Sequence, residues 1–150
     1  MKIVLLESLA ISEDMLNQYA DALCQAGIEN ILALRGDYPE GYDPSAPRDY
    51  RYARDLVEEI RAYGGFSIGG ACYPEGHVEC PSQREDLRHL KEKVDCGVDF
   101  LVTQMFFDNS ALYSFLYRAQ QVGITVPVLA GIMPVTNKAQ IKRIMDISGT

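Results

Sequence analysis

The sequence lacks the features that define several large classes of protein. It has no basic run of even four residues, and 14 Lys+Arg against 21 Asp+Glu give the 150-residue chain a net charge of −7. Binding to nucleic acid or to anionic lipid normally needs clustered positive charge. No apolar stretch reaches the roughly 18 residues of a membrane span. The apolar run near the N-terminus stops at Glu7, short of the about 7 residues that a signal peptide needs. We therefore expect a cytoplasmic protein with neither nucleic-acid nor membrane partners.

Motifs for common catalytic and metal sites are also missing. The four cysteines, Cys24, Cys72, Cys80 and Cys96, form no CxxC pair and have no histidine at ligand spacing. This argues against a zinc or thioredoxin-like site and predicts no metal and reduced, buried thiols. The chain has no GxSxG elbow, no GxGxxG or Walker loop, and only two histidines. A nucleophile-elbow hydrolase and a phosphate-binding glycine loop are therefore not indicated.

What the sequence does contain is one pattern repeated four times. An amphipathic run ends at a glycine followed by a hydrophobic residue, and a short apolar run rich in β-formers comes next. The joints are Gly27-Ile28, Gly65-Phe66, Gly97-Val98 and Gly123-Ile124. The runs predicted as strands are 31–34, 66–72, 100–107 and 126–130, with one more at 3–6. Helix starts are predicted at Ser12, Ser82 and Asn137, because each has a capping residue type in front of a helical pattern.

Alternating helices and apolar strands predict a parallel α/β architecture in a single domain over residues 1–150. Four or five strands do not close a barrel, since a complete (β/α)₈ barrel takes about 200 residues or more. The pattern therefore leaves two possibilities open. The chain is either a small open sheet or part of a larger barrel.

Polar clusters follow the predicted strands, at the edge where parallel α/β proteins collect their chemistry. Arg35-Gly36-Asp37 follows the second strand, residues 73–79 follow the third, and residues 131–134 follow the last. Gln104 stands inside the apolar run 100–107. Its amide would cost about 1–3 kcal/mol if it were buried without partners. Either a ligand or a neighbouring backbone group would satisfy it, and the sequence leaves both open.

At these clusters the sequence resembles the methylenetetrahydrofolate reductase family. The motifs that carry the resemblance are residues 30–37 (NILALRGD), 73–79 (YPEGHVE), 86–94 (DLRHLKEKV), 103–107 (TQMFF) and 131–134 (GIMP). The family's fold is a (β/α)₈ TIM barrel, so the resemblance implies an incomplete barrel of about four or five βα units. It also implies a flavoprotein that reduces 5,10-methylenetetrahydrofolate to 5-methyltetrahydrofolate with FAD and with NADH or NADPH. That reaction belongs to one-carbon metabolism and methionine supply.

The resemblance implies roles for individual residues. Asp37 matches an aspartate beside the flavin ring that also faces the folate, where a carboxylate would stabilise the cationic iminium form of the substrate. Gln104 matches a glutamine that bonds the pterin or the nicotinamide, and Gln140 matches a second folate-side glutamine. Asp37 and Gln104 are thus the implied catalytic residues. The residues at FAD-contacting positions are Arg35, Gly36, Asp37, Tyr52, Ala53, Tyr73, His77, Val78, Glu79, Cys80, Asp86 and Lys93.

The sequence departs from the family pattern: the eighth strand with its folate-side arginine has no match, and residues 77–80 read HVEC where the family commonly has HPEA. The family's first-strand glutamate, which acts as the acid for the folate nitrogen, has no match here, and neither has its third-strand His-Leu-Thr-Cys flavin contact. We therefore expect a chain that resembles the middle of the barrel and that is inactive alone. The alternative is a non-catalytic module, either an incomplete barrel or a flavodoxin-like binding domain that needs a partner chain. A homo-oligomer or a completing chain is expected in either case.

Overall fold

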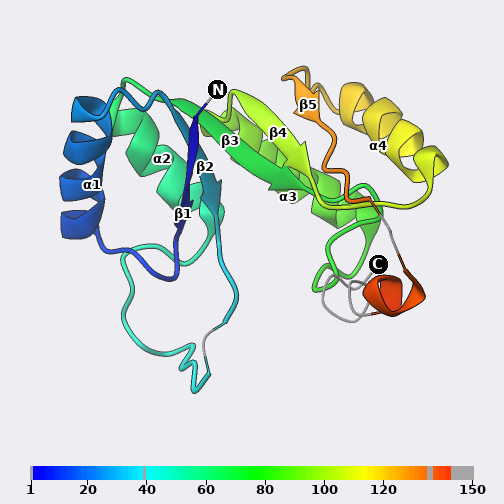
Figure 1. Ribbon diagram of the computed structural model, residues 1–150, viewed down its shortest axis with the longest axis horizontal. Helices are drawn as coiled ribbons and strands as arrows, with labels where there is room; N and C mark the ends of the chain where they lie inside the picture. The colour runs from blue at the N-terminus through cyan, green and yellow to red at the C-terminus, as the bar shows by residue number, and fades with distance from the viewer. Residues whose placement is uncertain (1, 39, 135–136, 143–150) are drawn as a thin grey trace. The chain divides into compact units, whose positions relative to one another are not determined.

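Five strands alternate with four helices in the computed structural model, which describes residues 2–38, 40–134 and 137–142 (Figure 1). The strands are β1 (Ile3–Glu7), β2 (Asn30–Leu34), β3 (Ser67–Cys72), β4 (Phe100–Thr103) and β5 (Val128–Leu129). The helices are α1 (Glu13–Gln25), α2 (Ala53–Tyr63), α3 (Gln83–Asp95) and α4 (Asn109–Gln121). Each of these four helices connects two successive strands, as the repeated sequence pattern predicted, and residues 138–142 are helical after β5.

The strands are parallel and follow one another in chain order, β1-β2-β3-β4-β5. The register places Val4 opposite Ile31, and Ile31 opposite Ile68. This is the order of successive βα units in a (β/α)₈ barrel, so the predicted fold class is confirmed, with five of the eight strands present in the described residues. The flavodoxin-like alternative is wrong, because that fold orders its strands 2-1-3-4-5.

The chain divides into two compact units, which we describe separately. The first comprises Met1–Gly70 and Lys93–Phe100, and the second comprises Ala71–Glu92 and Leu101–Thr150. The first unit contains β1, β2, α1 and α2, and the second contains α4 and β5.

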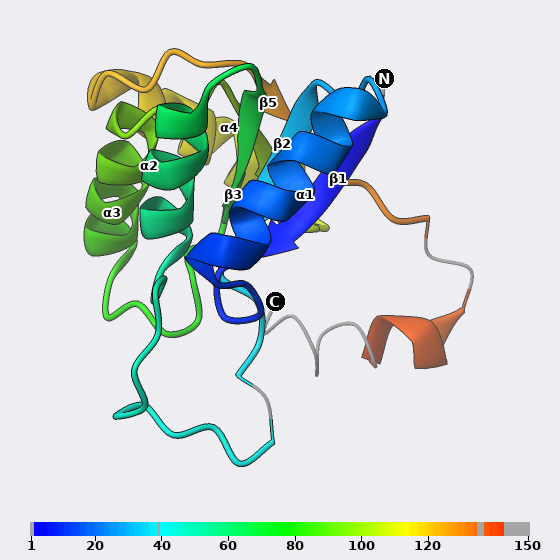
Figure 2. The same ribbon diagram turned by 90° about the vertical axis from the view of Figure 1, so that its left-hand side faces the viewer.

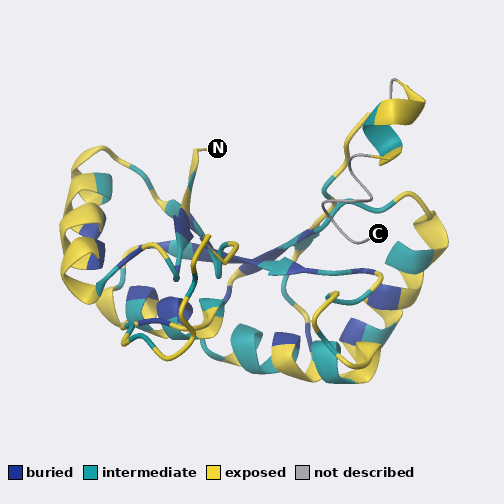
Figure 3. Cartoon of the chain, turned by 90° about the horizontal axis from the view of Figure 1, so that it is seen from below, coloured by how far each residue is buried: buried dark blue, intermediate teal, exposed yellow. Residues whose placement is uncertain are grey.

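In the first unit the strands bury one face beneath α1 and α2, which lie on the same side of β1 and β2 (Figures 1 and 2). Ile31, Ala33 and Ile68 on this face are fully buried. The helices bury a complementary apolar set, namely Leu16, Ala20, Leu56, Val57 and Ile60. Figure 3 shows the same division, with buried residues on the strands and the inner sides of the helices. The opposite face of β1 is more open, since Ile3 and Leu5 are 37% and 50% exposed.

The four predicted glycine joints are confirmed. Gly27, Gly65, Gly97 and Gly123 all have positive φ, between 67° and 124°. After α1, the N–H of Ile28 donates to Leu23 O at 2.9 Å and that of Gly27 to Cys24 O at 3.0 Å. This is the Schellman pattern, and it satisfies carbonyls that the helix end leaves unpaired. The end of α4 repeats it, with Ile124 donating to Ala119 O at 3.0 Å.

The predicted helix starts are also confirmed. The side chains of Ser12, Ser82 and Asn137 each accept a hydrogen bond from the backbone N–H three residues later, at 3.3, 3.2 and 2.9 Å. The sequence analysis missed two further capping interactions, one made by the N-cap of α4 and one by the third residue of α2. Asp108 Oδ1 accepts from Ser110 N at 2.8 Å at the start of α4, and Asp55 Oδ2 accepts from the Tyr52 N–H at 2.9 Å at the start of α2.

Two strands are shorter than predicted. The run 100–107 forms a strand only as far as Thr103, and 126–130 forms one only at Val128–Leu129. The physical reason is that β4 pairs with β5 through just two residues, Leu101 and Val102. Beyond them the Thr103 hydroxyl accepts from Gly131 N at 2.8 Å in place of a ladder bond. Gln104 therefore lies just after the strand and not inside it.

The expectation of buried thiols is confirmed for Cys72 only. All four cysteines are free, but Cys24 is exposed and Cys80 and Cys96 are partly buried. Cys24 lies in the last turn of α1, away from the buried residues Leu16 and Ala20 of that helix, so an apolar residue type did not imply burial there. No helix within the described residues combines the length and the apolar composition that a bilayer span requires.

Gly69 is a sensitive position in the sheet of the first unit. A Cβ at this position would lie 2.5 Å from the ring of Phe100 and 3.1 Å from Leu32 Cδ1. We predict that Gly69→Ala lowers the free energy of unfolding by about 1–3 kcal/mol, because the buried ring must move. Urea denaturation of Gly69→Ala, Phe100→Leu and the double variant measures this. The smaller leucine side chain of Phe100→Leu should relieve part of the cost, and strictly additive losses would refute the proposed contact.

Candidate functional site

The end of β2 carries the Arg35-Gly36-Asp37 cluster. Gly36 has a φ of 82°, and a Cβ there would lie 2.8 Å from Glu7 Oε2 at the end of β1. Ser8 and Leu9, which follow β1, donate backbone hydrogen bonds to Leu34 O at 2.8 Å and Arg35 O at 3.1 Å. The Asp37 side chain is exposed and makes no hydrogen bond or ion pair with any described residue. The first unit therefore presents an available carboxylate on a backbone fixed by its neighbour strand.

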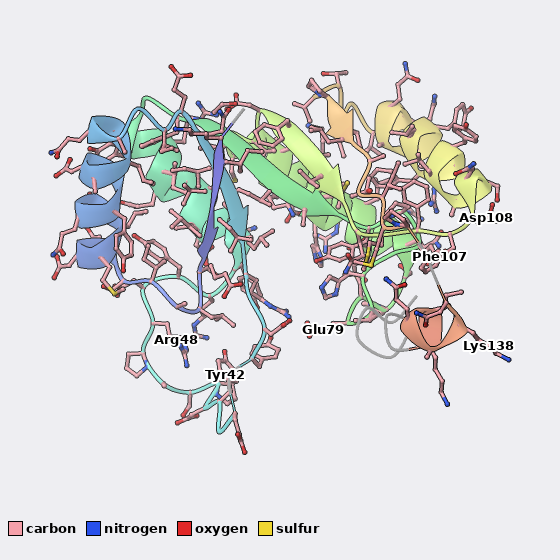
Figure 4. All side chains as sticks on the ribbon, in the orientation of Figure 1. Tyr42, Arg48, Glu79, Phe107, Asp108 and Lys138 are labelled. Carbon is pink, nitrogen blue, oxygen red and sulfur yellow. The ribbon has the colours of Figure 1, made fainter. Side chains whose placement is uncertain are left out.

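A long loop, residues 35–52 between β2 and α2, is held by stacked aromatic and cationic side chains. The Arg35 guanidinium lies 4.5 Å from the Tyr38 ring, and the Tyr38 and Tyr42 rings are 4.4 Å apart. The Arg48 guanidinium in turn lies 4.8 Å from the Tyr42 ring and donates to Leu9 O at 3.1 Å (Figure 4). We call these four residues, Arg35, Tyr38, Tyr42 and Arg48, the stacked ladder. Each cation–π contact is worth about 0.5–1 kcal/mol at exposed sites, so together they order the loop after Arg35.

Hydrogen bonds and burial perturb two acids in this loop. The Ser45 hydroxyl and backbone N–H both donate to Asp43 Oδ1, at 2.7 and 2.8 Å, and lower the pKa of that carboxyl. Burial raises the pKa of Tyr50 to about 12, with nearby Glu59 and Glu13 adding to the effect. Its hydroxyl is buried without a hydrogen-bond partner among the described residues. Tyr50 is therefore neutral at physiological pH and anchors the loop by packing.

The remaining predicted cofactor residues of the first unit lie on helices. Tyr52 is the N-cap of α2, with its side chain 58% exposed, and Ala53 is the first residue of that helix. Lys93 is in the last turn of α3 and is partly buried. The predicted roles of these three residues stay predictions.

In the second unit, β3 continues into a structured loop, Tyr73–Cys80, which we call the 73–80 loop. Gly76 N donates to Tyr73 O at 3.0 Å, and Cys80 N donates to His77 O at 2.9 Å, so the loop is two successive turns. The His77 ring meets the Tyr73 ring edge-on at 4.6 Å, and its Nδ1 accepts from Glu79 N at 3.1 Å. Val78 and Glu79 are exposed, with Glu79 directed outward in Figure 4. The structure thus brings together the rings of Tyr73 and His77 and the backbone N–H of Glu79.

Beside this loop lies a small, shallow hollow that is partly open to solvent. Tyr73, Gly76 and Asp86 line it, together with three residues that the sequence analysis did not single out, Gln83, Phe115 and Arg118. Arg118 projects from α4, and its guanidinium bonds both Gln83 Oε1 and Pro74 O. No local sequence pattern predicts these contacts of Arg118, because its partners lie 35 and 44 residues away in the sequence.

The Gln104 side chain bonds a neighbouring backbone group, which was one of the two alternatives that the sequence left open. Its N–H donates to Cys72 O at 2.7 Å, and its own Oε1 accepts from Met105 N at 3.1 Å. The side-chain amide N–H₂ has no hydrogen-bond acceptor among the described residues. Gln104 therefore has donors available at the end of β4. Further along, Gln140 is partly buried, with its amide nitrogen 3.9 Å from the Met133 sulfur.

The polar groups of both units follow the carboxyl ends of parallel strands, which is where α/β enzymes bind small molecules. The available groups are a carboxylate, an imidazole and amide donors. Taken by itself, each group can hydrogen-bond a hydroxyl, carbonyl or ring nitrogen of a polar organic ligand. Nowhere among residues 2–38, 40–134 and 137–142 do three or more His, Cys, Asp and Glu side chains gather so as to hold a metal ion.

The fold and the polar residues after its strands define a (β/α)-barrel type of domain, and comparison with known proteins identifies its family. The family model for methylenetetrahydrofolate reductase matches residues 2–150. The chain belongs to the methylenetetrahydrofolate reductase family, as the sequence motifs predicted.

Several curated relatives carry that name. The probable methylenetetrahydrofolate reductase (NADPH) of Caenorhabditis elegans is 44% identical over 124 residues, which cover 81% of this chain and 19% of the relative. The 5,10-methylenetetrahydrofolate reductase of Escherichia coli (strain K12) is 41% identical over 122 residues, covering 81% of this chain and 40% of the relative. Methylenetetrahydrofolate reductase 2 of Saccharomyces cerevisiae is 39% identical over 135 residues, which cover 86% of this chain and 22% of the relative. The chain thus spans less than half the length of these relatives.

A solved structure of a protein from Clostridium thermocellum, described as binding two copies of 5-methyl-5,6,7,8-tetrahydrofolic acid, shares the fold. It superposes with a TM-score of 0.66 and covers 99% of this chain and 49% of its own length, at 15% sequence identity. The similarity to a protein of this fold agrees with the parallel βα order of the chain.

The conformation of Gly36 gives a test of the strand-end geometry. We predict that Gly36→Ala lowers the free energy of unfolding by about 1–2 kcal/mol from backbone strain. Part of the loss comes from the close approach of Glu7. Gly41→Ala is a matched control, because Gly41 also has positive φ (74°) but has no atom within 4 Å of an added Cβ. Urea denaturation should show a larger loss for Gly36→Ala. An equal or smaller loss would show that the contact with Glu7 is absent in solution.

Proposed function

We propose that the chain carries the central part of the flavin- and folate-binding surface of a methylenetetrahydrofolate reductase. The reaction is the reduction of 5,10-methylenetetrahydrofolate to 5-methyltetrahydrofolate, with NADH or NADPH as the reductant and FAD as the cofactor. The names of the relatives support the reaction, and those of the C. elegans and Oryza sativa relatives name NADPH and NADH respectively. The observation that carries the proposal is the placement of the family's motif residues at the ends of four successive parallel strands. Four free cysteines, one of them exposed, support a reducing, cytoplasmic setting.

The side chains present fit the polar parts of FAD. Asp37 and Asp86 offer carboxylates to hydroxyl groups, His77 offers a ring N–H, and Arg35 offers a cation next to an aromatic ring. Tyr52, Ala53, Tyr73, Val78, Glu79, Cys80 and Lys93 are proposed to complete the contacts. Gly36 permits the close approach of Glu7 to the backbone at the end of β2, since a Cβ there would lie 2.8 Å from Glu7 Oε2. When bound, the flavin would carry hydride from the nicotinamide to the folate.

Two residues are proposed to act on the substrate. The Asp37 carboxylate stabilises positive charge on the folate as the iminium form of the substrate develops, which is electrostatic catalysis by a fixed charge. Gln104 donates from its available amide N–H₂ to a carbonyl of the pterin or of the nicotinamide, and so orients either one. Gln140 is proposed as a second contact on the folate side.

The role of Asp37 is best tested in a chimaera in which residues 2–150 replace the matching segment of the E. coli relative. We predict that Asp37→Asn retains FAD and slows flavin reoxidation by methylenetetrahydrofolate by about 10²-fold, with a smaller effect on flavin reduction by the nicotinamide. Only the reoxidation by methylenetetrahydrofolate builds positive charge beside the carboxylate. Stopped-flow flavin absorbance separates the two half-reactions.

Glu40→Gln is the control for this experiment, because Glu40 is an exposed carboxylate three residues further along the same loop. It should leave both half-reactions unchanged. Equal slowing of both half-reactions by Asp37→Asn, or loss of FAD, would assign Asp37 a role in holding the flavin.

We also propose that the 150-residue chain associates with a second copy or with a completing chain. β1 is at one end of the strand order of the described residues, and its Ile3 and Leu5 are well exposed. Strand edges with unpaired backbone groups favour pairing with another chain. Sedimentation at micromolar concentration should show species larger than a monomer. A stable monomer would count against this proposal, and Leu5→Lys should shift the distribution toward the monomer if it is correct.

A further inference from the structure

Arg118 reaches from α4 to the loop that follows β3. Its three guanidinium nitrogens all have acceptors: Nε donates to Ser114 O at 3.2 Å, Nη1 to Gln83 Oε1 and Nη2 to Pro74 O at 3.4 Å. Ser114 belongs to the same helix, but the other two acceptors belong to the 73–80 loop and to the first residue of α3. One planar group is therefore fixed against its own helix and bonds two other segments of the second unit.

Gln83 continues this contact into the loop. Its Oε1 accepts from Arg118, and its Nε2 donates to Glu75 O at 3.0 Å. Gly76 has a φ of 95°, and a Cβ there would lie 3.2 Å from Gln83 Cγ. The glycine thus permits both the turn and the close approach of the Gln83 side chain. Through Arg118 and Gln83, the carbonyls of Pro74 and Glu75 are both bonded.

A second arginine on a helix shows what an ordinary surface contact looks like. Arg88 on α3 pairs with Glu85 at 3.2 Å and with Glu92 at 2.9 Å, both on its own helix, and its side chain is 58% exposed. Such exposed pairs contribute about 0.2–1 kcal/mol and constrain no loop. Arg118 is only partly exposed and bonds a backbone carbonyl 44 residues away in sequence. Its contacts fix tertiary structure, whereas those of Arg88 stay within one helix.

We propose that Arg118 and Gln83 are positioning residues that hold the 73–80 loop in its functional conformation. The backbone that they fix is the turn at Pro74–Gly76, and His77 follows directly. In this conformation the Glu79 N–H occupies Nδ1 of His77, so the neutral ring carries its proton on Nε2. The loop then presents one defined ring N–H donor to a ligand oxygen. That the ligand is the flavin cofactor rests on the proposed function, but the positioning itself does not.

Lysine cannot replace Arg118 in this role. An ammonium group is a compact donor at the end of a flexible chain, whereas the guanidinium spans two acceptors in a fixed plane. Gln83→Glu distinguishes the two hydrogen bonds of the Gln83 side chain, one to Arg118 and one to Glu75 O. The carboxylate of this variant still accepts from Arg118, but it has no donor for Glu75 O. The two substitutions therefore dissect the contact without removing either side chain.

The test uses the 150-residue chain without ligand, labelled with ¹⁵N, at pH 8. Amide exchange of Gly76, Glu79 and Cys80 reports the loop, and ring ¹⁵N shifts report which nitrogen of His77 carries the proton. Arg118→Lys and Gln83→Ala should raise the exchange rates of these amides about tenfold, the loss expected for a hydrogen bond of ordinary strength, and should mix the His77 tautomers. Gln83→Glu should have a smaller effect of the same kind.

Arg88→Lys is the matched control and should change neither readout. Amides of α4 and β4 report whether each variant is folded, and since Gln83 is exposed, Gln83→Ala is expected to fold even if a change at Arg118 does not. Unchanged loop exchange and a single His77 tautomer in Arg118→Lys and Gln83→Ala would overturn the proposal. Flavin affinity is measured separately in the chimaera. A loosened loop with undiminished flavin affinity would contradict the cofactor role of the loop while leaving the positioning role established.

Discussion

The position of the residues at the carboxyl ends of the strands depends on the glycine of positive φ that follows each helix. A residue with a side chain incurs a steric penalty at positive φ, and Gly27, Gly65, Gly97 and Gly123 all adopt it. The next residue is apolar in each case, and Phe66, Val98 and Ile124 are at most 5% exposed. The glycine therefore sets where the chain leaves the helix, and the apolar residue after it sets where the strand begins. Because the strands have only two to six residues, the start of each strand also determines which residues emerge at its carboxyl end.

The loops that follow β2 and β3 are held by side chains from other segments of the same unit. In the first unit the stacked ladder runs from Arg35 to Arg48 and ends on Leu9 O, so the segment after β2 is tied to the segment after β1. In the second unit Arg118 and Gln83 bond the turn after β3. Both arrangements use an arginine whose planar group has several partners at once. The residues proposed to contact ligands, Asp37 and His77, thus lie on loops that other residues make rigid.

The sequence predicted the local features and missed those that join distant segments. Glycine joints and the caps at Ser12, Ser82 and Asn137 involve residues within about five positions of each other, so residue type and spacing suffice to predict them. The end of β4 depends on β5, a strand 25 residues further on. The apolar run 100–107 did not show that the pairing with this strand stops before the run ends. The contacts of Arg118 and the stacking of Arg48 on Tyr42 have no sequence pattern, because the fold alone brings those residues together. The motif residues of the strand ends were predicted from resemblance to the family.

The central claim is that the carboxyl ends of the strands hold the flavin and the folate. Hydrogen exchange of the chimaera, measured by mass spectrometry with and without FAD and 5-methyltetrahydrofolate, tests it most directly. The account predicts slower exchange in peptides that cover residues 35–38, 73–80 and 104–107, and no change in those that cover the glycine joints at 27, 65, 97 and 123. Protection at the glycine joints, or in none of these peptides although the ligands are bound, would contradict it.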